Sequence, residues 1–261
     1  MKGRSEEHVE TKAPVKLLWT GGWDSTFRLV WLVLVERRKV QPVYIIEFER
    51  RSSLNELGAM ARIKEKMRKR TDDLAGLLAP TQVFLKSEIE PQPKITEKFK
   101  ALSARFRVGS QFEWLSRFAE NPEITGIELA IEKNTFRPRD PVFEYLGRHL
   151  VKVKDCHRLM DPSLDLDLEL FRHFRFPTYF KTKLEMGEEA KRANFYDILL
   201  ESWFCHRPRR GGPCGTCTPC VDAMEEGFKF RLPPASRLRF FFNKRVQKAK
   251  RIIRPQKTTG R

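Results

Sequence analysis

The sequence predicts an α/β protein with a doubly wound, mainly parallel sheet. Residues 15–19 (VKLLW) form a short apolar run that leads into a glycine turn, as a buried strand does. Residues 26–36 are apolar almost all round, which is typical of a helix packed between a sheet and another element, and residues 43–48 form a second apolar run. The order strand, glycine turn, helix, strand indicates a βαβ unit, whose two strands are parallel.

The rest of the chain continues this alternation of helices and strands. Residues 54–79 are rich in Lys, Arg, Glu, Met and Ala and predict one long helix or two. We expect further strands at residues 82–86, 124–131 and 149–153, and further helices at residues 109–119, 182–194 and 221–228. A chain of 261 residues, 40% of them hydrophobic, is large enough for one such domain, which we place at residues 15–228.

The composition argues against several other classes of protein. Charged residues make up 33% of the chain, which is high but far from a disordered composition. No apolar run reaches the roughly 18 residues of a membrane span, and residues 1–16 lack the apolar core of a signal peptide. We therefore expect a cytoplasmic protein without a membrane span. The five cysteines are odd in number and four crowd together, which argues against a disulfide scaffold.

The glycine loop at residues 20–26 (TGGWDST) is the strongest single feature of the sequence. It follows the first predicted strand, and open α/β sheets bind ligands at the carboxyl ends of their strands. Glycines let backbone N–H groups approach an anion, the following helix N-terminus adds its dipole, and Asp24 can hold Mg²⁺ against phosphates. The residues expected to contact a phosphate group or its Mg²⁺ are Thr20, Gly21, Gly22, Asp24, Ser25 and Thr26.

A second feature is a group of cysteines with the spacing CX8CXXCXXC in residues 205–220. Four thiolates this close in sequence can surround one tetrahedral Zn²⁺, and a closed four-sulfur site is structural, without an open position for catalysis. An iron–sulfur cluster and a redox-active pair are alternatives, since soft thiolates suit each of them. The predicted zinc ligands are Cys205, Cys214, Cys217 and Cys220. Cys156 lies beside His157, but we expect it to be a buried or partly exposed thiol without a catalytic role.

The glycine loop is neither a Walker motif nor a dinucleotide fingerprint. It resembles the SGGxDS pyrophosphate loop of the PP-loop ATP pyrophosphatases, with Thr20 in place of the usual serine. Together with the cysteine knuckle, residues 15–228 resemble the 7-cyano-7-deazaguanine synthase family. Residues 202–205 (SWFC) are similar to that family's entry into its zinc site, and residues 180–185 (FKTKLE) to its lysine-bearing helix start.

This resemblance implies an adenine nucleotide α-hydrolase-like fold that binds ATP, Mg²⁺ and Zn²⁺. It implies a ligase of queuosine biosynthesis that adenylates a small-molecule carboxylate, after which ammonia or an amine displaces AMP to give an amide and then a nitrile. The residues that the resemblance places at the reacting phosphates are Asp24, Ser25, Lys181 and Lys183. The family's proline-glycine-arginine-asparagine and tyrosine-proline-aspartate-cysteine segments are missing, which favours a divergent branch with another carboxylate. Residues 109–114 (GSQFEW) could line its substrate site.

The end of the chain, residues 229–261, is a basic tail with twelve Lys or Arg and no Asp or Glu. Removing these twelve charges from the net charge of +17 leaves +5 for the other residues. The tail could bind nucleic acid, an acidic protein or anionic lipid, dock on the chain's own residues 161–169, or remain a solvated charge run. An apolar stripe of a helix could be formed by Leu238, Phe241, Phe242, Val246 and Ile252.

Three functions therefore stay open at the level of sequence. The first is the adenylating enzyme described above. The second is a divergent PP-loop enzyme that modifies RNA or conjugates a small molecule to a macromolecule, which the basic tail favours. The third is a non-catalytic ATP-binding module, against which the retained Asp24 and Ser25 argue. We also keep open a homodimer as the assembly.

Overall fold

A five-stranded sheet forms the centre of the molecule in the computed structural model, which describes residues 13–133 and 141–253, with side chains as far as residue 246. The strand order is β3-β2-β1-β4-β7, and every neighbouring pair is parallel. The strands are β1 (Val15–Leu18), β2 (Val40–Ile46), β3 (Gln82–Leu85), β4 (Ile127–Glu128) and β7 (Phe174–Arg175). The prediction of an α/β protein with a mainly parallel sheet is confirmed.

The chain reverses its direction of travel across the sheet at β1. After β1 it moves outward to β2 and β3, and it then returns to place β4 on the other side of β1. Such a reversal opens a crevice at the carboxyl ends of the two central strands, where doubly wound sheets bind ligands. The glycine loop directly follows β1, so the topology places it at this crevice.

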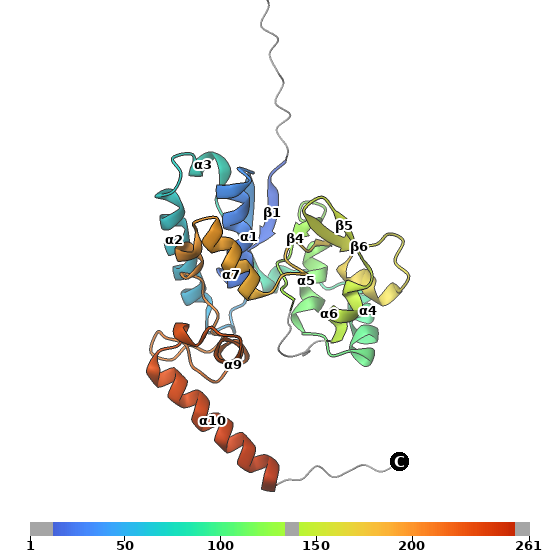
Figure 1. Cartoon of the computed structure of the whole chain (residues 1–261). Helices are drawn as coiled ribbons and strands as arrows, with labels where there is room; N and C mark the ends of the chain where they lie inside the picture. The colour runs from blue at the N-terminus through green and yellow to red at the C-terminus, as the bar shows by residue number, and fades with distance from the viewer. Residues whose placement is uncertain (1–12, 134–140, 254–261) are drawn as a thin grey trace, which may run out of the picture.

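Helices pack on both faces of the sheet (Figure 1). Their side chains and those of the strands form two separate apolar cores. The core that contains Leu17 and Trp19 lies against helices from both ends of the chain. These are α1 (Trp23–Val30) with its π-helical extension Trp31–Val35, α2 (Ser53–Arg68), α3 (Leu74–Leu77), α7 (Lys183–Arg192) and α8 (Tyr196–Leu199). The core that contains Val43 and Ile127 lies against α4 (Pro93–Arg105), α5 (Gln111–Ala119), α6 (Pro141–Gly147) and the 3-10 turn Leu166–Phe171.

Several elements differ from the sequence prediction. The strand expected at residues 124–131 is only two residues long, although the N–H groups of Gly126 and Leu129 on either side of it still donate to the carbonyls of His173 and Arg175 in the β7 segment. The strand expected at residues 149–153 is β5 (Leu150–Val153), which pairs antiparallel with β6 (Cys156–Leu159) in a separate hairpin. The turn between them has Lys154 in the left-handed region, at φ 56°. Short apolar runs do not reveal which sheet a strand joins, since that depends on distant parts of the chain.

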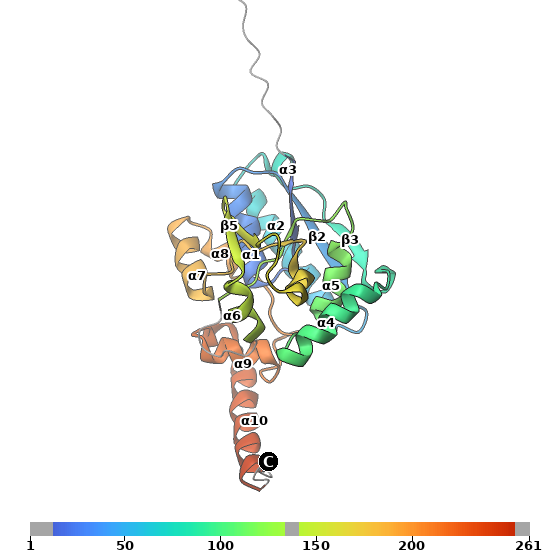
Figure 2. The same ribbon diagram turned by 90° about the vertical axis from the view of Figure 1, so that its right-hand side faces the viewer.

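The C-terminal part begins with α9 (Thr218–Glu225) and ends with α10 (Pro234–Ile253). A 3-10 turn, Lys229–Arg231, joins them, and a similar turn, Lys86–Glu88, follows β3. Leu232 is buried in the core around α1, so the basic segment starts inside the packed body. From there α10 projects away from the rest of the molecule in both views (Figures 1 and 2). Within the described residues, no helix is long and apolar enough to cross a membrane.

Candidate functional site

The glycine loop has a backbone that only glycine fits at its second position. Gly21 has φ 69°, and a Cβ there would lie 3.1 Å from both the Glu56 carbonyl oxygen and Met60 Cγ. Gly22 follows in extended conformation as the N-cap of α1, and no side chain caps this helix. The first-turn amides of a helix have no intrahelical acceptor, so they form a ready site for an anion.

The hydroxyl groups of the loop divide into two kinds. Thr26 is fully buried, its hydroxyl accepts a hydrogen bond from Trp19 Nε1 at 3.1 Å, and its N–H donates to the Gly22 carbonyl at 2.9 Å. Thr26 therefore holds the shape of the loop. Thr20 is partly exposed beside Gly22. Ser25 is buried, but its hydroxyl makes a long hydrogen bond of 3.4 Å to the Gly22 carbonyl. Thr20 and Ser25 are the hydroxyls that can turn to a ligand.

A cluster of charged side chains surrounds Lys183 at the start of α7. Thr182 and Glu185 form a capping box that fixes where this helix begins. Lys183 Nζ donates to Glu132 and, at 3.1 Å, to Glu226. Glu132 follows β4 in the chain, so two neighbouring strands, β1 and β4, each lead into this cluster at their carboxyl ends.

Burial perturbs the acids of this cluster strongly. It raises the pKa of Asp24 to about 6, an effect that Lys183 opposes and Glu226 reinforces. Burial and the charge of Asp24 together raise the pKa of Glu132 to about 8. Burial also disfavours the charge of Lys183, but the surrounding carboxylates outweigh it and raise the Lys183 pKa above its ordinary value. Asp24 Oδ1 is buried and has no hydrogen-bond partner among the described residues.

The cluster therefore has more negative than positive charge once its acids ionise. Asp24, Glu132 and Glu226 face one ammonium group, and an additional cation would relieve their mutual repulsion. Mg²⁺ is usually held by one or two carboxylates together with phosphate oxygens. An unpartnered buried carboxylate oxygen next to an open helix N-terminus fits that arrangement.

The raised pKa of Glu132 predicts a stability that falls with pH. The folded protein keeps a proton on Glu132 between pH 4.5 and about 8, where the unfolded chain releases it, so the free energy of unfolding decreases across this range. In Glu132→Gln this decrease should become smaller by on the order of 1 kcal/mol or more, as chemical denaturation at pH 5 and pH 8 would measure. Glu144→Gln, at an exposed residue that pairs with Arg148, should keep the wild-type pH dependence, and an unchanged dependence in Glu132→Gln would contradict the assignment.

Lys181 lies apart from this cluster, although only two residues separate it from Lys183. Its Nζ pairs with Glu189 at 2.5 Å and lies 5.5 Å and 5.7 Å from the ring centres of Phe27 and Trp31. Lys181 precedes the N-cap, whereas Lys183 is the first residue of α7, so the two side chains leave the chain in different directions. The structure brings Lys183 to the candidate site and gives Lys181 a packing role.

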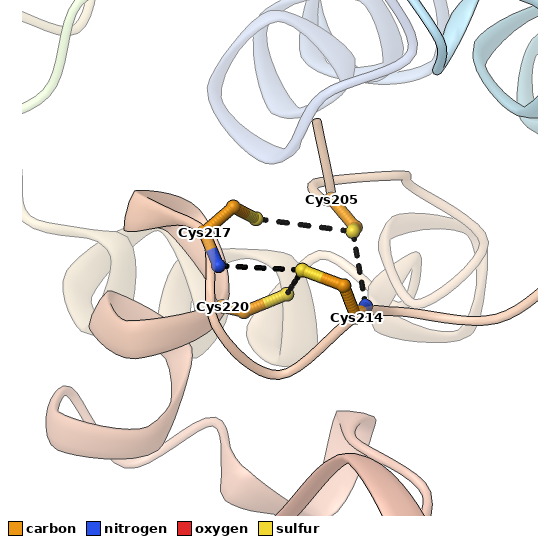
Figure 3. Close-up of side chains that lie close together, drawn as sticks. All are labelled: Cys205, Cys214, Cys217 and Cys220. Atoms are coloured by element: carbon orange, nitrogen blue, oxygen red, sulfur yellow. Dashed lines mark hydrogen bonds between the residues drawn. The ribbon is translucent and has the colours of Figure 1, made fainter. Parts of the chain in front are cut away.

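The four cysteines of the knuckle converge in the structure. Their sulfur atoms lie within 4.8 Å of one another and face inward in Figure 3, and the described cysteines form no disulfide. Two Sγ–Sγ distances, Cys205 to Cys217 and Cys214 to Cys220, are 3.8 Å and 3.9 Å. Tetrahedral Zn²⁺ with Zn–S bonds of about 2.3 Å requires about 3.8 Å between sulfurs. The group can hold a metal ion such as zinc.

Backbone geometry supports the cysteine cluster as a metal site. The Cys214 N–H donates to Cys205 Sγ at 3.1 Å, and the N–H groups of Thr216 and Cys217 donate to Cys214 Sγ at 3.3 Å. Such N–H groups stabilise thiolates, which are the form that binds metal. Gly215 has φ 82°, and a Cβ there would lie 2.0 Å from the Ser236 carbonyl oxygen. Only glycine allows this turn and the close approach of α10.

The segment before the cysteines is joined to the glycine loop. The Trp203 N–H donates to the Gly21 carbonyl at 2.7 Å, and Trp203 Nε1 donates to the Cys205 carbonyl at 2.7 Å. One tryptophan therefore connects the phosphate-binding candidate with the metal-binding candidate, which lie far apart in sequence.

A small, largely apolar cavity lies between these two features. Its lining residues are Trp23, Lys183, Phe204, Pro219, Ala223, Glu226, Phe228 and Arg231. The Arg231 guanidinium lies 5.2 Å from the ring centre of Trp23 and 4.9 Å from that of Phe204, and it donates to Ser202. It forms no ion pair with the residues that the structure describes, and burial lowers its pKa to about 10. Arg231 is thus a buried cation packed against aromatic rings, with no ion pair among the described side chains.

The sequence analysis did not predict three residues of this region as site residues: Glu132, Glu226 and Arg231. Glu132 could have been suspected, because it follows a predicted strand, but only the strand order brings it to β1. Phe112, from the segment expected to line a substrate site, instead packs in the opposite core against Phe143 and Phe171. Comparisons with protein-family models, with curated proteins and with solved structures gave no match for this chain.

Proposed function

We propose that the protein is an ATP-dependent adenylating enzyme that activates a carboxylate and releases pyrophosphate. The observation that carries the proposal is the open N-terminus of α1 beside a buried cluster of Asp24, Glu132 and Lys183. A helix N-terminus binds the anion, a lysine neutralises it, and carboxylates hold its Mg²⁺. The resemblance of the glycine loop to pyrophosphate loops supports the same function.

In the proposed reaction, the loop amides with Thr20 and Ser25 hold the β- and γ-phosphates of ATP. Asp24 and Glu132 would hold Mg²⁺, which shields the negative charge of the phosphates when bound. A carboxylate oxygen of the substrate attacks the α-phosphorus, and the bond from that phosphorus to the pyrophosphate oxygen breaks. Lys183 compensates the charge that develops on the leaving pyrophosphate. An amine or ammonia then attacks the acyl carbon, AMP leaves, and an amide forms.

The substrate carboxylate would have a partner in Arg231. A guanidinium binds a carboxylate through paired hydrogen bonds, and such pairs are stronger where water is excluded. The rings of Trp23, Phe204 and Phe228 line the small cavity beside this guanidinium and keep its surroundings apolar. Positioning of two reactants in this way lowers a barrier without any covalent participation by the protein.

The cysteine cluster would bind Zn²⁺ in a structural role, because four sulfurs leave no open coordination position. Its contribution to the site is to hold Trp203 against Gly21, and to fix the segment that carries Phe204.

A pair of lysine variants tests the proposed function. Lys183→Met should lower the rate of carboxylate-dependent pyrophosphate release by at least about 100-fold, because it removes the charge beside the leaving group. Lys181→Met changes the same kind of side chain two residues away and should lose less than about threefold. Release is measured with a panel of carboxylic acids and ammonium present. Equal losses in the two variants would contradict the assigned site, and ATP binding without AMP release in wild type would indicate a non-catalytic module.

A further inference from the structure

Helix α10 exposes a row of large apolar side chains on one of its faces. Leu238, Phe241, Phe242 and Val246 are 57%, 55%, 58% and 51% exposed. Their spacing of three and four residues places them on one side of a helix. Ile252, which the sequence pattern adds to this stripe, has no described side chain. Exposed apolar groups that gather on one face indicate an interaction surface.

The opposite face of α10 is fixed to the body of the protein. Ser236 Oγ donates to the Pro213 carbonyl at 2.5 Å, Arg239 Nε donates to the Cys214 carbonyl at 2.8 Å, and Phe240 is only 6% exposed. The cysteine segment therefore sets the direction of the helix, which projects away from the body in Figures 1 and 2. The apolar row faces solvent and no described part of the chain covers it.

The charge of residues 229–261 distinguishes three possible partners of α10: a second copy of this chain, nucleic acid and a lipid surface. Residues 229–261 carry twelve Lys or Arg and no Asp or Glu. Two copies of this chain that paired through α10 would bring these like charges together, which opposes self-association. Duplex nucleic acid would satisfy the cations but leave the apolar row in water. Single-stranded nucleic acid could stack its bases on Phe241 and Phe242, but it would leave Leu238 and Val246 uncovered. An anionic lipid surface satisfies both, because headgroups pair with the cations while the acyl boundary takes up the apolar side chains.

We propose that α10 docks the protein on an anionic membrane surface. The helix lies in the plane of the headgroups, with Leu238, Phe241, Phe242 and Val246 inserted at the acyl boundary. Arg245, which the helical period places on the same face, extends its guanidinium toward the headgroups. This is an attachment to the surface of the bilayer, which differs from a membrane span. It is independent of the proposed ATP chemistry, since α10 contributes no described residue to the candidate site.

Sedimentation with vesicles tests this proposal. Wild-type protein should bind vesicles of phosphatidylcholine and phosphatidylglycerol, and bind pure phosphatidylcholine vesicles at least about tenfold more weakly. The variant Phe241→Ser with Phe242→Ser keeps every charge and should bind the anionic vesicles at least about tenfold more weakly at physiological salt. Phe48→Ser with Leu54→Ser removes two other exposed apolar residues and should bind as wild type does.

Three results would overturn the membrane assignment. Undiminished vesicle binding by the Phe241/Phe242 variant would show that charge alone attracts the protein. Tighter binding to a single-stranded RNA oligomer than to anionic vesicles would assign the helix to nucleic acid. A wild-type dimer that the Phe241/Phe242 substitutions dissociate would assign the apolar row to a second copy. Zinc content and Tm, measured for each variant, verify that the compared proteins are equally folded.

Discussion

Asp24→Asn should abolish carboxylate-dependent pyrophosphate release, with a loss of about 1000-fold or more. The substitution keeps the size of the side chain but removes the buried charge that would hold Mg²⁺ against the phosphates. The loss should appear in the rate at saturating ATP and should persist at high Mg²⁺. The measurement is pyrophosphate release by a coupled assay, in parallel with AMP formation.

The stability of Asp24→Asn separates this effect from misfolding. Because burial raises the pKa of Asp24 to about 6, its ionised form destabilises the folded protein above that pH. Asparagine carries no charge, so the variant should be at least as stable as wild type at pH 8. Asp72→Asn changes an exposed aspartate and should keep both activity and stability. An active Asp24→Asn enzyme, or a strongly destabilised one, would contradict the role assigned to this carboxylate.

Loss of a metal ligand should have the second large effect, this time on the free energy of unfolding. Three of the four cysteines are buried in the same core as Trp23 and Phe228, so a missing ligand opens part of that core. Cys217→Ser should lower the Tm by on the order of 10 °C, since a structural zinc site contributes several kcal/mol or more to folding. A chelator applied to wild-type protein should produce a similar decrease.

Cys156→Ser is the matched control for this prediction. Cys156 is also buried, but it lies in β6 away from the cluster and donates only to the Val153 carbonyl. Its replacement should shift the Tm by at most a few degrees and leave the zinc content at about one ion per chain. If Cys217→Ser retained both its zinc and its Tm, the cysteine cluster would not be the structural metal site.

The sequence predicted the parts of the site that short segments determine. The glycine loop and the cysteine cluster each depend on a few adjacent residues, and the structure places the loop after β1 and brings the cysteines together. The mainly parallel sheet could be predicted because the two strands of the first βαβ unit must run in the same direction. The need for glycine at position 21 could also be predicted from a short segment, because its positive φ is a property of the turn itself.

The remaining site residues depend on contacts between distant segments. Glu132 reaches the cluster only because β4 returns to the side of β1, and Arg231 only because the chain after α9 packs against Trp23. The choice between Lys181 and Lys183 depends on the capping box, in which Thr182 is the N-cap and Lys183 becomes the first residue of α7. Sequence spacing alone treats these two lysines as equivalent. Their partners in space, Glu189 for one and Glu132 for the other, distinguish them.

The position of the cysteine knuckle also suggests why it accompanies the glycine loop. Trp203 bonds to Gly21 on one side and to Cys205 on the other, so the knuckle fixes one wall of the crevice. If zinc holds this wall, its removal should weaken ATP binding as well as stability. The two motifs would then form one functional unit, in spite of the 180 residues or so between them in sequence.

The products of ATP cleavage test the central proposal most directly. Zinc-loaded protein is incubated with ATP, Mg²⁺, ammonium and a panel of carboxylic acids that includes heteroaromatic ones, and the phosphorus products are identified by ³¹P NMR. The proposal predicts AMP and pyrophosphate in equal amounts, formed only when a suitable acid is present. Formation of ADP and inorganic phosphate, or no cleavage with any acid by protein that binds ATP, would contradict it.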